Sequence, residues 1–155
     1  MAASVAVPAF GLLFQKENTT SATFSTIIEI TKLDGPSLTR GAIDVTHMQS
    51  PSNTKEYIGG MRDLGEVSFT AHFVPTNALH KLIYADMIRG ADYSDNIDGW
   101  KIVFPDASFG GAATSTVWGP IKGFVTGFKP SAVAGDEALM VDVTVKLSGI
   151  QSELP

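Results

Sequence analysis

The stretch GEVSFTAHFV at residues 65–74 alternates apolar and polar side chains from Glu66 to Phe73. Successive side chains of a β-strand point to opposite faces, so strict alternation is typical of a strand with one buried face. One face carries Val67, Phe69, Ala71 and Phe73, and the other carries Glu66, Ser68, Thr70 and His72. The segment therefore predicts a half-buried strand that covers a hydrophobic core.

A helix from about Thr76 to Arg89 is predicted directly after this strand. Thr76 or Asn77 can cap its first turn, and Gly90 can end it. Helical spacing predicts that the buried stripe consists of Leu79, Leu82, Ile83 and Met87.

Two further apolar residues of the helix, Tyr84 and Ile88, lie away from that stripe at helical spacing. A helix that is apolar on a second side needs a second surface to pack against. We therefore predict that Tyr84 and Ile88 contact another subunit.

The rest of the chain has the composition of strands. Residues 24–32 are rich in β-branched and aromatic types and predict one strand, with Phe24, Thr26, Ile28 and Ile30 on one face. A turn at 33–37 separates this strand from a second one at 39–47. Further strands are predicted within residues 100–105, 115–130 and 138–150.

The last predicted strand alternates again, which places Leu139, Val141, Val143, Val145 and Leu147 in the core. Six or seven strands with one helix predict a mostly β fold. We expect two packed β-sheets, arranged as a sandwich or barrel, with one flanking α-helix.

Glycines at 119, 123 and 127 punctuate the strand within 115–130 and predict bulges or strong coiling of the sheet. Trp100 and Trp118 also lie in strand contexts. A tryptophan in such a context is expected to belong to the core.

Length and composition favour one self-associating domain. The chain has 155 residues, 44% of them apolar and only 17% charged, against about 25% charged in a typical soluble domain. A monomer so poor in charge would expose apolar patches, which usually mark contact surfaces. We predict a single domain over residues 1–155, with an N-terminal arm at 1–9.

The charge and the termini exclude several classes of protein. A net charge of −5 argues against stable nucleic-acid binding. The absence of cysteine excludes disulfides and thiolate metal sites. Residues 1–14 are apolar, but no basic residue precedes them and the segment is short and interrupted, so neither a signal peptide nor a membrane span is predicted.

A polar, aperiodic segment at residues 48–57 predicts a long loop that is either exposed to solvent or ordered by a partner. The candidate contact residues are Ser50, Pro51, Ser52, Asn53, Thr54 and Lys55.

No common catalytic or nucleotide-binding motif is present. His72, His80 and Asp86 could in principle form a metal or acid–base cluster, but solvated or hydrogen-bonded histidines are the commoner case. Arg89, three residues after Asp86, is the expected partner of that carboxylate. We predict no catalytic, cofactor-binding or metal site, no cofactor and no enzymatic activity.

Five segments occur in a fixed order: GPSLTRGAIDVTH at 35–47, YIGGMRDLGEVSFTAHFVPTNALHKLIYADM at 57–87, WKIVFPD at 100–106, GFVTGFKPS at 123–131 and DEALMVDVTVKLSG at 136–149. Together they resemble the tail tube proteins, also called major tail proteins, of lambda-type long-tailed bacteriophages. The resemblance runs from about Phe24 to Ile150.

The resemblance implies a virion tail protein, made in the host bacterial cytoplasm, that assembles with itself into stacked hexameric rings. In such a stack we expect the loop at 48–57, together with one or both termini, to contact the neighbouring ring. Its implied partners are the tape-measure, tail terminator and tail-tip proteins, and DNA would pass through the lumen without stable binding. An acidic lumen would repel phosphates. The lumen-facing candidates are Glu29, Glu66 and Asp142, although Lys146 shares the face of Asp142.

Three alternatives remain open at the level of sequence. A related tube subunit of a tailocin, a gene transfer agent or a secretion system would share the fold and the ring. A monomeric β-sandwich that binds ligands would display exposed aromatic side chains on one sheet face. A hydrolase would use His72 or His80 with Asp86.

Overall fold

The computed structural model describes residues 11–18, 23–88, 98–104, 117–131 and 135–148. The predicted N-terminal arm at 1–9 lies outside these residues. The described elements, in chain order, are β1 (Leu13–Glu17), β2 (Phe24–Thr26), β3 (Ile30–Asp34), β4 (Thr39–Asp44), a 3₁₀ turn (Pro51–Asn53), β5 (Tyr57–Asp63), β6 (Glu66–His72), α1 (Ala78–Ile88), β7 (Asp98–Val103), β8 (Val117–Ser131) and β9 (Met140–Leu147).

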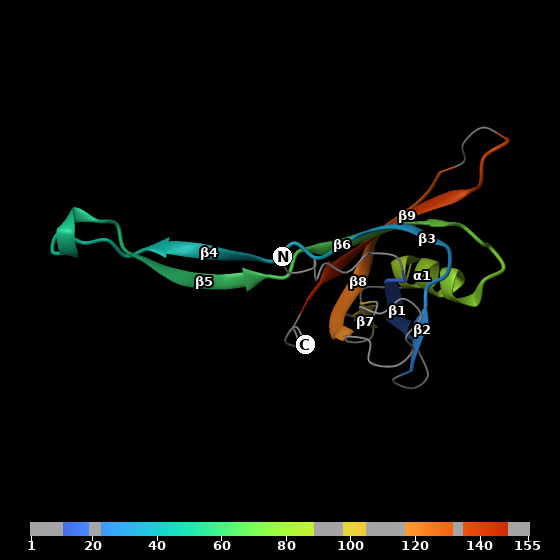
Figure 1. Cartoon of the computed structure of the whole chain (residues 1–155), viewed down its shortest axis with the longest axis horizontal. Helices are drawn as coiled ribbons and strands as arrows, with labels where there is room; N and C mark the ends of the chain where they lie inside the picture. The colour runs from blue at the N-terminus through green and yellow to red at the C-terminus, as the bar shows by residue number, and fades with distance from the viewer. Residues whose placement is uncertain (1–10, 19–22, 89–97, 105–116, 132–134, 149–155) are drawn as a thin grey trace, which may run out of the picture.

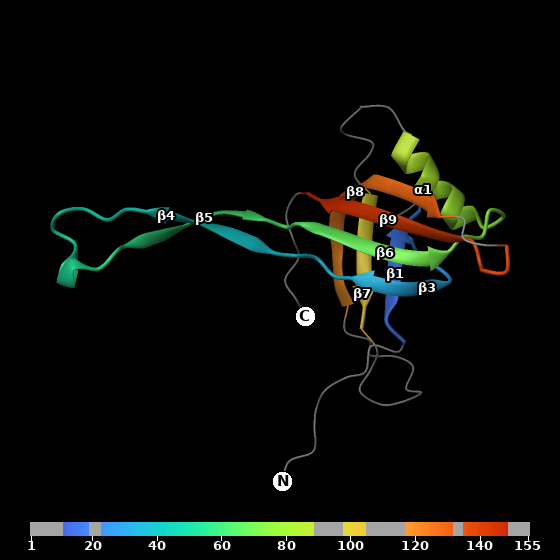
Figure 2. The same ribbon diagram turned by 90° about the horizontal axis from the view of Figure 1, so that it is seen from above.

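Seven of these strands form one antiparallel sheet in the order β2-β1-β7-β8-β9-β6-β3, and β4 pairs with β5 as a separate hairpin. The mostly β class with one helix is therefore confirmed. Figure 1 shows the hairpin extending far from the body formed by the other elements, and Figure 2 shows the protruding hairpin from above.

The large sheet curls over itself. Phe14 of β1 and Phe69 of β6 have ring centroids 5.4 Å apart, although four steps separate these two strands in the sheet order. The two packed layers are thus two halves of one continuous sheet. In β8 the register with β7 shifts around Gly119, and the register with β9 shifts between Val125 and Gly127. The bulges predicted at Gly119 and Gly127 are therefore confirmed, while the pairing at Gly123 is regular.

The core lies between the two halves of the sheet. The alternation predicted for β6 and β9 is confirmed, and Trp100 and Trp118 are both buried, as predicted. Leu139 is the exception, because it precedes β9 and is 37% exposed. Strands β6 and β9 contribute the buried residues Val67, Phe69, Ala71, Val141, Val143, Val145 and Leu147.

The single strand predicted at 24–32 is wrong. The chain breaks at Glu29, whose φ is 62°, so that β2 pairs with β1 while β3 pairs with β6. The backbone oxygen of Glu29 accepts a hydrogen bond from the His72 N–H at 2.9 Å. The four residues predicted on one face do not share one environment, since Ile28 is 42% exposed while Ile30 packs against the core.

The helix begins one residue after its cap, Asn77. The Asn77 Oδ1 accepts hydrogen bonds from the N–H groups of Leu79 and His80 at 2.9 and 3.2 Å. Between the two predicted caps, the structure selects Asn77. Gly90, the predicted end, lies outside the described residues, and no helix in the described part of the chain is long and apolar enough to cross a membrane.

Candidate assembly surfaces

The β4–β5 hairpin has no core of its own. Every residue of β4 is exposed, and β5 is exposed except for one half-buried position. Isolated two-stranded hairpins are marginally stable in water, yet this one displays large apolar side chains. Ile43, Ile58 and Met61 are 52%, 54% and 94% exposed. Exposed apolar surface of this kind marks a contact surface.

The hairpin has two different faces. Ile43 and Ile58 lie directly opposite each other and form an apolar face. Arg40 and Arg62 also lie directly opposite each other, but on the other face. The Arg40 Nε donates a hydrogen bond to the Gly60 carbonyl oxygen at 3.2 Å, which holds this side chain against the strand.

The predicted loop at 48–57 is the tip of this hairpin, and it contains all six candidate contact residues. The tip is ordered by its own hydrogen bonds. The Ser50 Oγ donates to the Glu56 Oε2 at 2.7 Å, and the Thr54 Oγ1 donates to the Pro51 carbonyl oxygen at 2.6 Å. Apart from the half-buried Ser50, the candidates are exposed, and the tip that contains them is the part of the hairpin farthest from the body (Figure 1).

The base of the hairpin is fixed to the body through residues 63–65. The Asp63 Oδ1 accepts a hydrogen bond from the Gly65 N–H at 2.9 Å and pairs with the Lys146 Nζ at 3.3 Å. The Gly65 N–H and then Lys146 lower the pKa of Asp63 below its usual 3.8. Gly65 has a φ of 72°, and a Cβ there would collide with the Ser37 carbonyl oxygen, so only glycine fits.

The outer side of α1 is a second apolar surface. Tyr84 and Ile88, the predicted contact residues, are 50% and 65% exposed, and the Tyr84 ring rests against Phe128 of β8 at 5.4 Å. Met87, predicted in the buried stripe, is 41% exposed. That prediction is wrong because Asp86 takes the buried position of the last turn.

Asp86 pairs with Lys16 of β1, and Arg89, the partner expected from the sequence, lies outside the described residues. The Lys16 Nζ is 2.6 Å from the Asp86 Oδ2, and both side chains are almost fully buried. Lys16 also lies over the Trp100 ring, 5.3 Å from its centroid. The pair ties the helix to the interior of the sheet.

His80 has a structural role. Its Nδ1 accepts a hydrogen bond from the Val74 N–H at 3.1 Å, and its Nε2 faces the Ile28 carbonyl oxygen at 3.4 Å. Among the described residues, no three His, Asp or Glu side chains are grouped to hold a metal. Asp86 is engaged by Lys16, so these residues do not form the acid–base cluster considered above.

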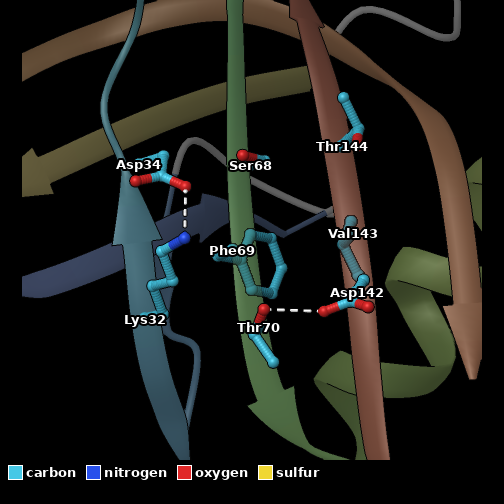
Figure 3. Close-up of a pocket in the computed structure, with 8 residues that line it drawn as sticks. All are labelled: Lys32, Asp34, Ser68, Phe69, Thr70, Asp142, Val143 and Thr144. Carbon is cyan, nitrogen blue, oxygen red and sulfur yellow. Dashed lines mark hydrogen bonds and ion pairs between the residues drawn. The ribbon is translucent and has the colours of Figure 1, made fainter. Parts of the chain in front are cut away.

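The third surface is the polar face of β3, β6 and β9, shown in Figure 3. The Thr70 Oγ1 donates to the Asp142 Oδ1 at 2.6 Å, and Lys32 pairs with Asp34 at 3.1 Å. A shallow pocket between these strands is lined by Lys32, Asp34, Ser68, Phe69, Thr70, Asp142, Val143 and Thr144.

Two of the three acidic lumen candidates share this polar face. Glu66 lies opposite Lys146, and Asp142 lies between Thr70 and Lys129 in the strand register. Glu29 stands apart, exposed at the bend before β3. Cations accompany both carboxylates, so the face carries mixed charge.

The family model described as "Lambda phage tail tube protein, TTP" matches residues 13–152. No curated protein sequence matches the chain. Several solved structures share its fold at low sequence identity.

A chain from the tail of an empty gene transfer agent particle with C6 symmetry is 20% identical, with a TM-score of 0.67 over 95% of this chain and 98% of that chain. A sheath/tube terminator chain of an extracellular contractile injection system is 10% identical, with a TM-score of 0.69 over 98% and 100%. The SPP1 tail tube protein is 14% identical, with a TM-score of 0.57 over 92% and 77%.

Proposed function

Because this chain belongs to the lambda phage tail tube protein family and is thus a structural component of the virion tail and not an enzyme, we propose that six copies form a ring and that the rings stack into a hollow tube. The tube would conduct DNA from capsid to cell. The observation that carries this proposal is the projecting β4–β5 hairpin, an ordered and partly apolar element that the described part of its own chain leaves exposed.

The sheet supports lateral assembly within a ring. Its first and last strands, β2 and β3, each have an unpaired edge in the described part of the chain. Unpaired edges are templates for another strand, and closure into a barrel removes them. We assign the exposed side of α1, with Tyr84 and Ile88, to contacts between neighbouring subunits.

The hairpin tip, Ser50 to Lys55, is assigned to contacts between stacked rings. Figure 2 shows the tip far from the body, and this distance would let it reach beyond the ring that contains its own body. Its internal hydrogen bonds reduce the entropy that would be lost on docking.

The polar face of β3, β6 and β9 is assigned to the lumen, with Glu66 and Asp142 on the wall and Glu29 at its rim. Hydroxyl groups and paired charges give DNA phosphates no concentrated positive field to bind. The remaining proposed partners are the tape-measure protein inside the tube, the terminator at one end and the tail-tip proteins at the other.

A related tube of a gene transfer agent or an injection system is a second candidate, because the structures that share this fold include both. Genes for a tape-measure and a tail terminator beside this one would favour the phage tail. The ligand-binding alternative loses its expected cue, since Trp100 and Trp118 are buried.

Sedimentation velocity tests the proposal with two proteins, the wild type and a variant in which Ser50–Lys55 is replaced by Asn-Gly. The wild type is expected to form rings and larger stacks as concentration rises. The variant should fold and form rings that do not stack. Stacks of the shortened variant would contradict the role of the tip, and a wild type that remains monomeric at every concentration would contradict self-assembly.

A further inference from the structure

Arg40 and Arg62 form an unneutralised cationic pair on the hairpin. They lie directly opposite each other on β4 and β5, so both side chains are on the same face. Neither has an ion pair within the described residues, and the one side-chain hydrogen bond is that from Arg40 to Gly60. Like charges in directly opposed positions destabilise a strand pair. A carboxylate from another molecule that bound both arginines would offset this repulsion and stabilise the hairpin.

This pair lies next to the Thr39–Asp63 pair at the base of the hairpin, and the complementary charge lies on the body, beyond the far end of β6. Asp136 and Glu137 are adjacent and exposed in the turn before β9, and neither pairs with a cation in the described part of the chain. The hairpin precedes the first residue of β6, whereas the turn lies near the last residue of β6. There the Phe73 N–H donates a hydrogen bond to the Leu139 carbonyl oxygen at 2.7 Å. Figure 1 shows the hairpin and the turn at opposite ends of the long axis.

Complementary groups at two separate sites of one molecule generate a heterologous, head-to-tail contact, which closes into rings or continues into stacks. We propose that the Arg40–Arg62 pair binds the Asp136–Glu137 turn of a second copy of this chain. Two guanidinium groups facing two carboxylates allow paired, charge-assisted hydrogen bonds. The net charge of −5 favours a carboxylate of this acidic chain over a nucleic-acid phosphate as the partner.

This contact rests on the proposed function, and it deepens that function by specifying a charge-based interface between subunits. The apolar face of the same hairpin, with Ile43 and Ile58, would be buried beside it. The arginines would then fix which surface of the neighbour the hairpin meets.

A charge swap tests the contact. Arg40→Glu/Arg62→Glu reverses the charge on the hairpin, and Asp136→Lys/Glu137→Lys reverses the charge on the turn. The fourfold variant carries both changes, and its net charge is still −5. Each double variant is expected to fold with the wild-type circular dichroism spectrum and lose most tube formation in electron micrographs. The fourfold variant, and an equimolar mixture of the two double variants, should recover it.

Lys32→Glu/Lys122→Glu is the matched control, because it makes the same change in net charge as the arginine variant at two exposed lysines of the body. It is expected to form tubes. Tubes from either double variant, or folded double variants that the fourfold swap does not rescue, would overturn the contact. A wild type that forms no tubes would instead refute the proposed function on which it rests.

Discussion

The Lys146 Nζ of β9 lies 3.3 Å from the Asp63 Oδ1 at the base of the hairpin, and the same Asp63 oxygen accepts the Gly65 N–H at 2.9 Å. One carboxylate therefore links the projecting hairpin to the central sheet and also shapes the turn between them. Gly65 allows that turn because its φ is 72°. The direction in which the hairpin leaves the body is set by these few contacts.

Asp63→Ala is expected to loosen the hairpin without unfolding the body. The variant loses both the ion pair and the turn hydrogen bond, while the buried strands are untouched. Amide hydrogen exchange should accelerate in residues 39–63 and remain unchanged in β6 and β9. Lys32→Met, which breaks an exposed pair away from the hairpin, is the control. Equal exchange in wild type and Asp63→Ala would show that other contacts orient the hairpin.

The contacts of Asp63 with Gly65 and Lys146 should weaken at low pH, when the Asp63 carboxylate becomes protonated. The pKa of Asp63 is lowered in the folded chain, chiefly by the Gly65 N–H and then by Lys146, from a usual value of 3.8. A group with a depressed folded pKa contributes stability that is fully present above its unfolded pKa and is lost as pH falls through the folded value. An NMR titration should give an Asp63 midpoint below 3.8. A midpoint above that value would contradict the arrangement.

The buried pair of Lys16 and Asp86 should be strongly asymmetric in its response to mutation. Removing one partner leaves a buried charge, so Asp86→Ala should cost about 3–5 kcal/mol of unfolding free energy. Lys16→Met/Asp86→Leu should recover most of that loss, because apolar groups of similar volume replace both charges. Urea denaturation measures each value. A double variant no more stable than the single one would contradict this account.

The exposed face of α1 should matter for assembly and not for folding. Ile88→Glu places a charge on a side chain that is 65% exposed, and surface changes usually alter stability by less than about 0.5 kcal/mol. Thermal unfolding should be unchanged, while sedimentation velocity should show loss of rings. Lys81→Glu, on the same helix and also exposed, provides a comparison. Rings of normal size from Ile88→Glu would exclude Ile88 from the interface.

Charge reversal in the proposed lumen should slow DNA passage. Particles built with Glu29→Lys/Glu66→Lys/Asp142→Lys would present cations to phosphates and bind them in transit. We expect normal tails and several-fold slower DNA ejection, with a stronger effect at low salt. The lumen assignment fails if all three substitutions, singly and together, leave the ejection rate unchanged.

Local patterns predicted much of the fold because they coincide with burial. The alternation in β6 and β9 was correct for that reason. Of the two caps predicted for the helix, Asn77 is the one that accepts the first N–H groups. Strand β1 was not predicted, because Lys16 lies on its buried face and breaks the apolar pattern of this short strand. The break at Glu29 was missed because a non-glycine residue with positive φ carries no clear sequence signal.

The assembly surfaces depended less on local pattern. The β5 strand was not predicted because both of its faces are exposed and it contains two adjacent glycines. The facing of Arg40 and Arg62 follows from cross-strand register, and 21 residues of intervening chain conceal it in the sequence. The helix face at Tyr84 and Ile88 was visible because helical spacing alone separates it from the core.

Negative-stain electron microscopy of the purified, untagged protein over a concentration series tests the central claim most directly. The account predicts hollow tubes, or rings with six-fold symmetry in end-on views, that become more numerous and longer as concentration rises. Isolated particles of monomer size at every concentration would contradict self-assembly into a tail tube.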